Sequence, residues 1–271
     1  MSIKKFWKKS SVLSMIDLKT EQEIEIMLRG GKILAEVLKE VLNAAKVGVS
    51  ELELDKLAEK LILEKGGEPG FKKVAGYKHT ICISTNDVVV HGVPTEYKLK
   101  DGDVVGIDCG VYYKGFYTDI AQTVRVKSSK LKVQSSDEVD RFLKTGEKAM
   151  WEGIKAAKLG NRIGHISKAI QDIVESQGYS VVRSLIGHGV GRKLHEEPEI
   201  PGFLSDPVDK TPKLQEGMTI AIEVIYNMGK SDVSYSNSDG WTIKSKDHSL
   251  SGLFERTIAI TDDGPLVLTK K

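Results

Sequence analysis

A gap-free internal repeat constrains the fold of this chain more than any other feature of its sequence. Residues 99–108 align on residues 214–223, and the alignment places Asp108 on Glu223. A unit repeated once, at a spacing of about 115 residues, is too long and too few for a solenoid. The repeat therefore predicts two similar halves packed about a pseudo-twofold axis, with a carboxylate from each half meeting where the halves join.

Each half also carries a matching pair of predicted helices. Residues 44–48 correspond to residues 156–160, and each stretch is followed by a helical pattern that closes at a glycine, Gly66 or Gly178. Sequences typical of helix N-termini lie at residues 20–23, 50–53 and 135–138. We therefore expect two helices and then a strand in each half.

A hairpin is predicted over residues 104–126, where Lys114 and Gly115 separate two runs of alternating apolar residues. With a two-residue turn there, Asp108 and Asp119 share one face as diagonal neighbours, about 5–8 Å apart. A register shifted by one residue would instead leave both aspartates exposed. The other side chains on the shared face are small, while those on the opposite face are apolar: Val105, Ile107, Cys109, Val111, Ile120 and Val124. Two like charges this close repel each other unless one is protonated or a cation lies between them.

Two strands of the second half repeat this arrangement. Residues 218–226 carry Glu223 and residues 253–261 carry Glu255, each beside threonine and alanine and opposite an apolar face. A glycine-rich segment before them, residues 187–198, carries two of the six histidines of the chain. Its glycines permit close backbone approach, and we expect it to be a functional loop that brings His188 and His195 to a site.

Together these residues form a candidate ligand set: Asp108, Asp119, His188, Glu223 and Glu255. Four carboxylates and one imidazole suit two divalent cations better than one, and mostly oxygen donors argue against a structural zinc site. Two metals about 3.5–4 Å apart activate a bridging water, so hydrolysis is the first chemistry to consider. The residue types alone do not separate a peptide bond from a phosphate ester.

The order of these five residues resembles that of type I methionine aminopeptidases. The likeness also includes residues 84–92, residues 187–191 and residues 195–198, and it runs from about Ile16 to Leu268. It implies an α/β (α+β) fold of the pita-bread type, with a curved antiparallel sheet, outer helices and internal pseudo-twofold symmetry. It also implies removal of the initiator methionine from nascent polypeptides whose second residue is small.

The resemblance implies a role for each site residue. Asp108 resembles the chelating aspartate of one metal, Asp119 and Glu255 the bridging carboxylates, and His188 and Glu223 ligands of the other metal. Glu223 is also the expected general base. His195 resembles the histidine that hydrogen-bonds the scissile carbonyl, and His91 resembles one that contacts the substrate beyond the scissile bond.

The methionine pocket is expected to be apolar and aromatic, since a thioether gains from burial and from contact with rings. Tyr77, Cys82 and Trp241 resemble pocket residues of the family, and Phe71 is a weaker candidate. Two positions depart from the usual family pattern: Leu194 stands where phenylalanine is common, and Val90 where cysteine is common. These departures affect the shape of the pocket and leave the chemistry untouched.

The expected cofactors are two divalent metal ions. Co²⁺, Mn²⁺, Fe²⁺ and Zn²⁺ all accept this ligand set, so the sequence does not choose among them. Asn86, Val88 and Ser251 match a weak monovalent-cation site of some relatives, which gives a second, weaker expectation.

Composition agrees with one large catalytic domain over residues 16–271, preceded by a basic tail over residues 1–15. That tail is either a solvated terminus or a weak contact with ribosomal RNA or another anionic surface. A net charge of +2 predicts no strong attraction to DNA, and two cysteines suit a reducing cytoplasm. No stretch approaches the roughly 20 apolar residues of a membrane span, and the tail lacks the apolar run of a signal peptide. We expect a cytoplasmic monomer acting on the N-termini of nascent polypeptides.

Two alternatives to this function are open, and a third is excluded by the spacing of the ligands. A proline-specific dipeptidase or aminopeptidase shares the five ligands, but such enzymes usually have a large amino-terminal domain, and about fifteen residues precede the catalytic unit here. A non-catalytic scaffold is expected to have lost ligands, and all five are present. A type II enzyme would carry an insertion of about sixty residues in the second half, and the 35 positions from His188 to Glu223 do not contain one.

Overall fold

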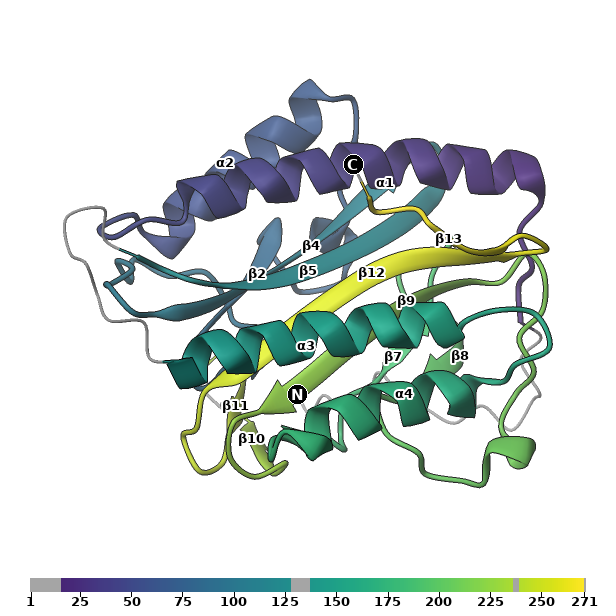
Figure 1. The fold of residues 1–271 in the computed structure, drawn as a ribbon. Coiled ribbons are helices and arrows are strands. Elements are labelled where there is room, and N and C mark those ends of the chain that lie inside the picture. The colour runs from purple at the N-terminus through teal and green to yellow at the C-terminus, as the bar shows by residue number, and fades with distance from the viewer. Residues whose placement is uncertain (1–15, 128–136, 236–238, 271) are drawn as a thin grey trace.

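The computed structural model describes residues 16–127, 137–235 and 239–270 (Figure 1). The basic tail predicted over residues 1–15 lies outside the described residues. None of the helices in the described ranges is both long enough and apolar enough to cross a membrane.

Four α-helices form two pairs, as the repeat predicts. In the first half they are α1 (Glu21–Ala44) and α2 (Glu51–Glu64), and in the second half α3 (Asp137–Ala156) and α4 (Ile163–Ser176). Capping boxes at Thr20 and Ser50 begin α1 and α2, because each hydroxyl accepts from the backbone N–H of a glutamate three residues on. After α2 and α4 the chain turns at Gly66 and Gly178 with φ of 78° and 81°, a conformation that favours glycine.

Within the described residues, ten strands form one sheet in which every pairing is antiparallel. Its main path has the order β1-β4-β5-β12-β9-β7-β8. Three further strands pair at its margins: β2 with β4, β13 with β12, and β6 with β9. The bounds are β1 (Glu68–Pro69), β2 (Ile81–Thr85), β4 (Val104–Tyr113), β5 (Phe116–Arg125), β6 (Ser180–Val181), β7 (Gly187–Gly189), β8 (Glu196–Ile200), β9 (Thr219–Asn227), β12 (Ser251–Thr261) and β13 (Gly264–Val267).

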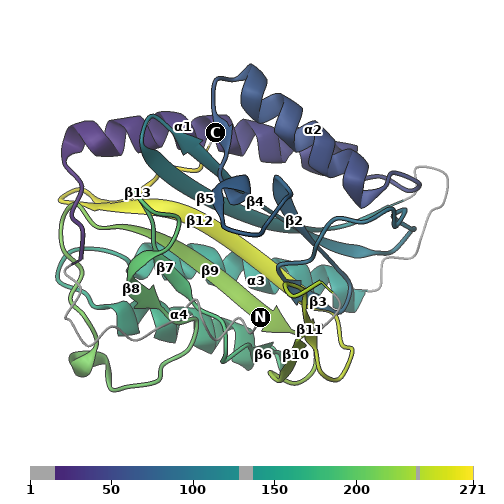
Figure 2. The same cartoon turned by 180° about the vertical axis from the view of Figure 1, so that it is seen from behind.

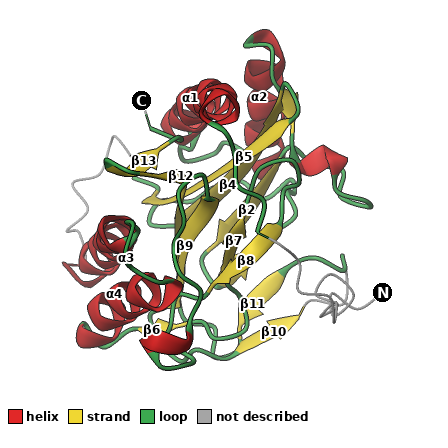
Figure 3. Cartoon of the chain, turned by 90° about the vertical axis from the view of Figure 1, so that its right-hand side faces the viewer, coloured by secondary structure: helices red, strands yellow, loops and turns green. Residues whose placement is uncertain are grey.

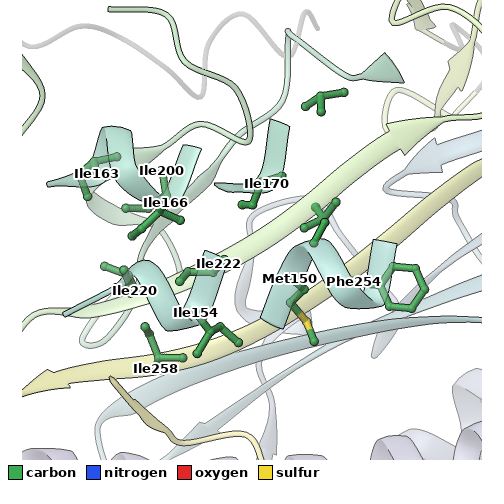
Figure 4. Close-up of a cluster of buried hydrophobic side chains, with 14 of the residues drawn as sticks. Met150, Ile154, Ile163, Ile166, Ile170, Ile200, Ile220, Ile222, Phe254 and Ile258 are labelled. Carbon is green, nitrogen blue, oxygen red and sulfur yellow. The ribbon is translucent and has the colours of Figure 1, made fainter. Parts of the chain in front are cut away.

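The helices cover one side of the curved sheet, with one pair over each half (Figures 2 and 3). Helix α1 packs on β4 and β5, and α3 packs on β9 and β12. The apolar strand faces meet these helices in two separate cores. The core of the second half, shown in Figure 4, joins Met150 and Ile154 of α3 to Ile220 and Ile222 of β9 and to Phe254 of β12. Asp108 and Asp119 lie on the opposite side of the sheet from these four α-helices.

The predicted hairpin register is confirmed. Asp108 pairs with Ala121 and Asp119 pairs with Gly110 across β4 and β5. Five of the six residues predicted for the apolar face lie in the core under α1 and α2, and the sixth, Val124, is half-buried outside that core. The register therefore places both aspartates on the side of the sheet away from the helices.

The glycine-rich segment was expected to be a loop, and that prediction is wrong for part of it. His188 lies in β7, which pairs with β9 on one side and with β8 on the other. A Cβ at Gly187 would lie 2.5 Å from the Ala221 carbonyl oxygen, and one at Gly189 would lie 2.2 Å from that of Glu197. The glycines thus allow strand pairing that a side chain would block.

A second sheet was not predicted. Its three strands, β10 (Val233–Tyr235), β11 (Ile243–Ser245) and β3 (Val88–Val90), pair antiparallel in that order. Strands this short carry too few residues to show a clear alternation. The sheet matters for the site because β11 follows Trp241 and β3 leads directly to His91.

Candidate active site

Strand pairing brings the predicted acids into one row across the sheet. Asp108 on β4 lies opposite Ala121 on β5, Ala121 lies opposite Glu255 on β12, and Glu255 lies opposite Glu223 on β9. One step further, His188 on β7 lies opposite Ala221, two residues from Glu223. Side chains in register on one face of a sheet are neighbours, so residues far apart in sequence converge here.

Distances confirm that the side chains meet. One ligand atom from each of Asp119, His188 and Glu255 lies within 4.8 Å of the others, and all three residues are buried. His188 Nε2 lies 4.0 Å from a carboxylate oxygen of Glu223. Asp108 completes the group, because its carboxyl lies close enough to Asp119 and Glu223 for their charges to raise its pKa.

The carboxylates of this group strongly disfavour ionisation when no cation is present. Burial raises the pKa of Asp119 to about 7, and burial together with the charge of Asp119 raises that of Glu223 to about 8. Burial and the neighbouring carboxylates raise the pKa values of Asp108 and Glu255 well above their usual range. A cluster of four such acids in a protein interior is typical of a site that binds cations.

The donor atoms fit divalent metal ions. Oδ1 of Asp108 is buried and has no hydrogen-bond partner among the described residues, so it is available as a ligand. Nδ1 of His188 lies 2.9 Å from the Gly189 carbonyl oxygen, and because a carbonyl only accepts, Nδ1 carries the hydrogen. This leaves the Nε2 lone pair facing Glu223, and burial lowers the His188 pKa to about 3, which keeps the ring neutral as metal binding requires.

Two more histidines, His195 and His91, lie close enough to His188 that, after burial, their charges also lower its pKa. The ring centroid of His195 lies 4.4 Å from that of His188, and the His195 side chain is exposed. His91 is half-buried and adopts a φ of 55°, and its Nδ1 has no partner among the described residues. Desolvation, with the charge of His195 second, lowers the His91 pKa to about 4, and desolvation also lowers that of His195. Both rings are therefore neutral at physiological pH and can donate or accept a hydrogen bond.

The three residues predicted for the methionine pocket lie in one apolar cluster. Tyr77 and Cys82 are buried and Trp241 is half-buried, and the rings of Tyr77 and Trp241 meet edge to face with centroids 5.1 Å apart. The Tyr77 hydroxyl donates to the Ile81 carbonyl oxygen at 2.8 Å, which fixes the ring. Cys82 lies opposite Asp108 in the β2–β4 register, so the cluster adjoins the acidic group.

Other residues complete this cluster. Phe71, the weaker candidate, is buried in it, and so is Leu194, which had been identified only as a departure from the family pattern. Gly110 explains the position of Phe71, because a Cβ there would lie 2.7 Å from a ring carbon of Phe71. The room left by the small face of the hairpin is thus partly filled by an aromatic ring. The contributions of Val74, Val93 and Tyr117 carried no sequence signal, since isolated apolar residues are usually core.

Two of the residues proposed for a monovalent cation are adjacent. The Asn86 carbonyl oxygen accepts from the Ser251 N–H at 2.9 Å, and Asn86 itself has a φ of 57°. Val88 lies in β3, paired with Lys244. These contacts bring the segments together, and a cation at this place stays a proposal.

The chain is similar to known proteins over nearly its whole length. Residues 25–262 match the model of metallopeptidase family M24. A methionine aminopeptidase of Clostridium perfringens is 43% identical over 255 residues, which are 94% of this chain and 99% of that protein. The crystal structure of methionine aminopeptidase from Thermotoga maritima superposes with a TM-score of 0.89 at 37% identity, covering 95% of this chain and all of the other. A prolidase from Pyrococcus horikoshii has a TM-score of 0.73 at 23% identity, with 94% of this chain matched to 63% of that one.

Proposed function

The chain belongs to metallopeptidase family M24 and removes N-terminal methionine, and we propose that it does so with two divalent metal ions held by five residues. The pita-bread fold expected from the sequence is confirmed by the Thermotoga structure. The observation that carries the proposal is the convergence of the five residues beside an apolar pocket: Asp108, Asp119, His188, Glu223 and Glu255. The likeness to prolidase, at 23% identity, supports the fold alone.

We assign the ligands by position. Asp108 would hold one metal, His188 and Glu223 would hold the other, and Asp119 and Glu255 would be shared by both. Four carboxylates balance the charge of two divalent ions, and one imidazole supplies the nitrogen donor. Metals bound there would lower the pKa of a water molecule and polarise a carbonyl. Co²⁺, Mn²⁺, Fe²⁺ and Zn²⁺ are all compatible with this donor set.

The remaining chemistry falls to side chains of the chain itself. Glu223 accepts the proton of the attacking water, because its carboxylate lies within the cluster, beside Nε2 of His188. His195 donates a hydrogen bond to the scissile carbonyl oxygen and to the oxyanion that it becomes, and its exposed ring next to His188 supports this role. His91, unpartnered at Nδ1, contacts the substrate beyond the scissile bond.

The apolar cluster binds the methionine side chain. Tyr77, Cys82 and Trp241 present two rings and a thiol, surfaces that suit a flexible thioether. The scissile carbonyl must reach the metals from this pocket, so the next residue of the substrate lies close to the protein. We therefore propose a preference for glycine, alanine or serine at the second position.

Substrate choice tests this function. We expect rapid release of methionine from Met-Ala peptides, slow release from Met-Leu, and little cleavage of Leu-Ala or Ala-Pro. Replacing methionine by a shorter side chain should cost about 1–3 kcal/mol, since buried methylene and sulfur contacts are lost. A peptide library scored by mass spectrometry would measure the rates. Equal cleavage of large and small second residues would contradict the initiator-methionine role.

Several finer features belong to the same proposal. The substrates are the N-termini of nascent polypeptides, residues 16–271 act as a single catalytic domain, and the enzyme is a cytoplasmic monomer. The basic tail of residues 1–15 makes a transient ribosome contact, and a monovalent cation binds weakly near Asn86, Val88 and Ser251. The supporting observations are the basic composition of the tail and the contact between Asn86 and Ser251.

A further inference from the structure

Lys19, just before α1, is a buried lysine. Its side chain is 1% exposed, and its ammonium group forms an ion pair with Glu196, whose side chain is 9% exposed. The same ammonium donates to the Asp17 carbonyl oxygen at 2.9 Å. Lysine is almost never fully buried unless it is paired, so the contact with Glu196 is a specific feature of this fold.

The backbone around Lys19 is also fixed. Its N–H donates to the Gly217 carbonyl oxygen at 2.7 Å, and Gly217 in turn donates to Ile260 of β12. Figures 1 and 2 show the chain that leads into α1 passing the segment before β9. On the other side, a Cβ at Gly191 would lie 2.2 Å from Cε of Lys19. The lysine side chain therefore runs directly over the glycine-rich segment.

Glu196 connects this lysine to His195. One oxygen of its carboxylate pairs with Lys19, and the other accepts the backbone N–H of Lys193 at 2.8 Å. The carboxylate thus closes a turn over residues 193–196. Leu194, on the other side of His195, is 8% exposed and packs in the methionine pocket. His195 is an exposed residue between two neighbours that are both anchored.

Other contacts of this turn are weaker. Arg192 pairs with Asp17 and Glu23, but its side chain is 50% exposed, and exposed pairs contribute little. The Lys19 ammonium also lies 3.3 Å from a carboxylate oxygen of Asp17, whose side chain is 40% exposed. Glu196 is therefore the partner of Lys19 that is shielded from water and salt.

A buried ion pair is weak evidence for stability, because desolvation of both charges offsets their attraction. What such a pair does supply is a defined geometry, since each group must meet its partner. We propose that Lys19 is a positioning residue: through Glu196 it holds His195 at the distance from the cluster that the reaction requires. This inference rests on the proposed role of His195 at the scissile carbonyl.

The test is a double-mutant cycle between Lys19 and His195. Lys19→Met keeps the length of the side chain and removes its charge. We expect it to lower kcat by about 10- to 100-fold, as a small misplacement of a reacting group does, with little change in KM or metal content. In a His195→Ala background the same substitution should change kcat by less than about twofold, because the group that it positions is already gone. Arg29→Met, which removes an exposed cation from α1, is the matched control and should leave kcat unchanged.

A second variant controls for misfolding caused by the unpaired charge of Glu196 in Lys19→Met. Lys19→Met with Glu196→Gln leaves no buried charge unpaired, and the amide oxygen can still accept from Lys193. It should fold and still show reduced kcat, since the contact that fixes the turn is lost. If Lys19→Met lowered kcat by the same factor in the wild type and in His195→Ala, Lys19 would only anchor the N-terminal segment. This result would overturn the proposal.

Hydrogen exchange gives a readout that does not need activity. Amides of residues 193–196 should exchange faster in Lys19→Met than in the wild type or in Arg29→Met, while α4 should be unaffected. Unchanged exchange in the turn would refute the positioning role, whatever the substrate proves to be. Failure of the wild type to release methionine would instead count against the proposed function, so the two failures are distinguishable.

Discussion

Replacing Asp119 by alanine is expected to abolish metal binding and methionine release together. Asp119 is 4% exposed, and it lies within 4.8 Å of donor atoms on both His188 and Glu255. As the proposed shared ligand, Asp119 would hold both metals. Its loss should therefore remove several kcal/mol of transition-state stabilisation, which corresponds to a rate lower by about a thousandfold or more. Asp108→Ala and Glu255→Ala should behave in the same way.

The measurements are metal content by atomic emission and methionine release from a Met-Ala peptide. Asp172→Ala is the matched control, because Asp172 is an exposed aspartate on α4 that pairs with Lys168. It should bind metal and turn over like the wild type. Two bound metals with near-native turnover in any of the three ligand variants would refute the assignment of a two-metal site.

His195→Ala is expected to separate catalysis from metal binding. The side chain is exposed and lies next to His188 without belonging to the buried ligand group, so metal content should stay near native. Removal of one oxyanion donor should lower kcat by about 10²–10³-fold. Kinetics on a Met-Ala peptide and a metal assay of the same sample measure both quantities.

His248→Ala is the control for His195, because the His248 side chain is 78% exposed and pairs with Asp87 on the surface. We expect it to leave kcat and metal content unchanged. If His195→Ala lost its metal while the remaining loaded fraction worked at the normal rate, the roles of His188 and His195 would be exchanged.

The acidic face could be predicted because strand alternation and a two-residue turn define a register. The pairing of Asp108 with Ala121 followed from the turn at Lys114 and Gly115, and the structure has that pairing. Glu223 and Glu255 followed in the same way, since each interrupts a small-residue face opposite an apolar one. The repeat also predicted that the two halves meet. They do so where β5 of the first half pairs with β12 of the second half, which in turn pairs with β9.

Features that depend on tertiary pairing were missed. The strand character of His188 comes from β9 on one side and β8 on the other, and nothing in the three-residue segment Gly187–Gly189 signals it. The burial of Lys19 depends on Glu196, a residue 177 positions away. Because lysines are usually exposed, the sequence alone predicts an exposed side chain for Lys19. Phe71 was underrated because its place depends on the absence of a side chain at Gly110.

Metal removal and reconstitution with two peptides tests the central claim most directly. The protein is treated with a chelator, and a divalent metal is then added stepwise while hydrolysis of Met-Ala and Ala-Pro peptides is followed. Activity on Met-Ala should be absent without metal and should return as metal binds the cluster of Asp108, Asp119, His188, Glu223 and Glu255, with Ala-Pro remaining uncleaved. Full activity on Met-Ala in the verified absence of metal, or restored cleavage of Ala-Pro in preference to Met-Ala, would contradict the account.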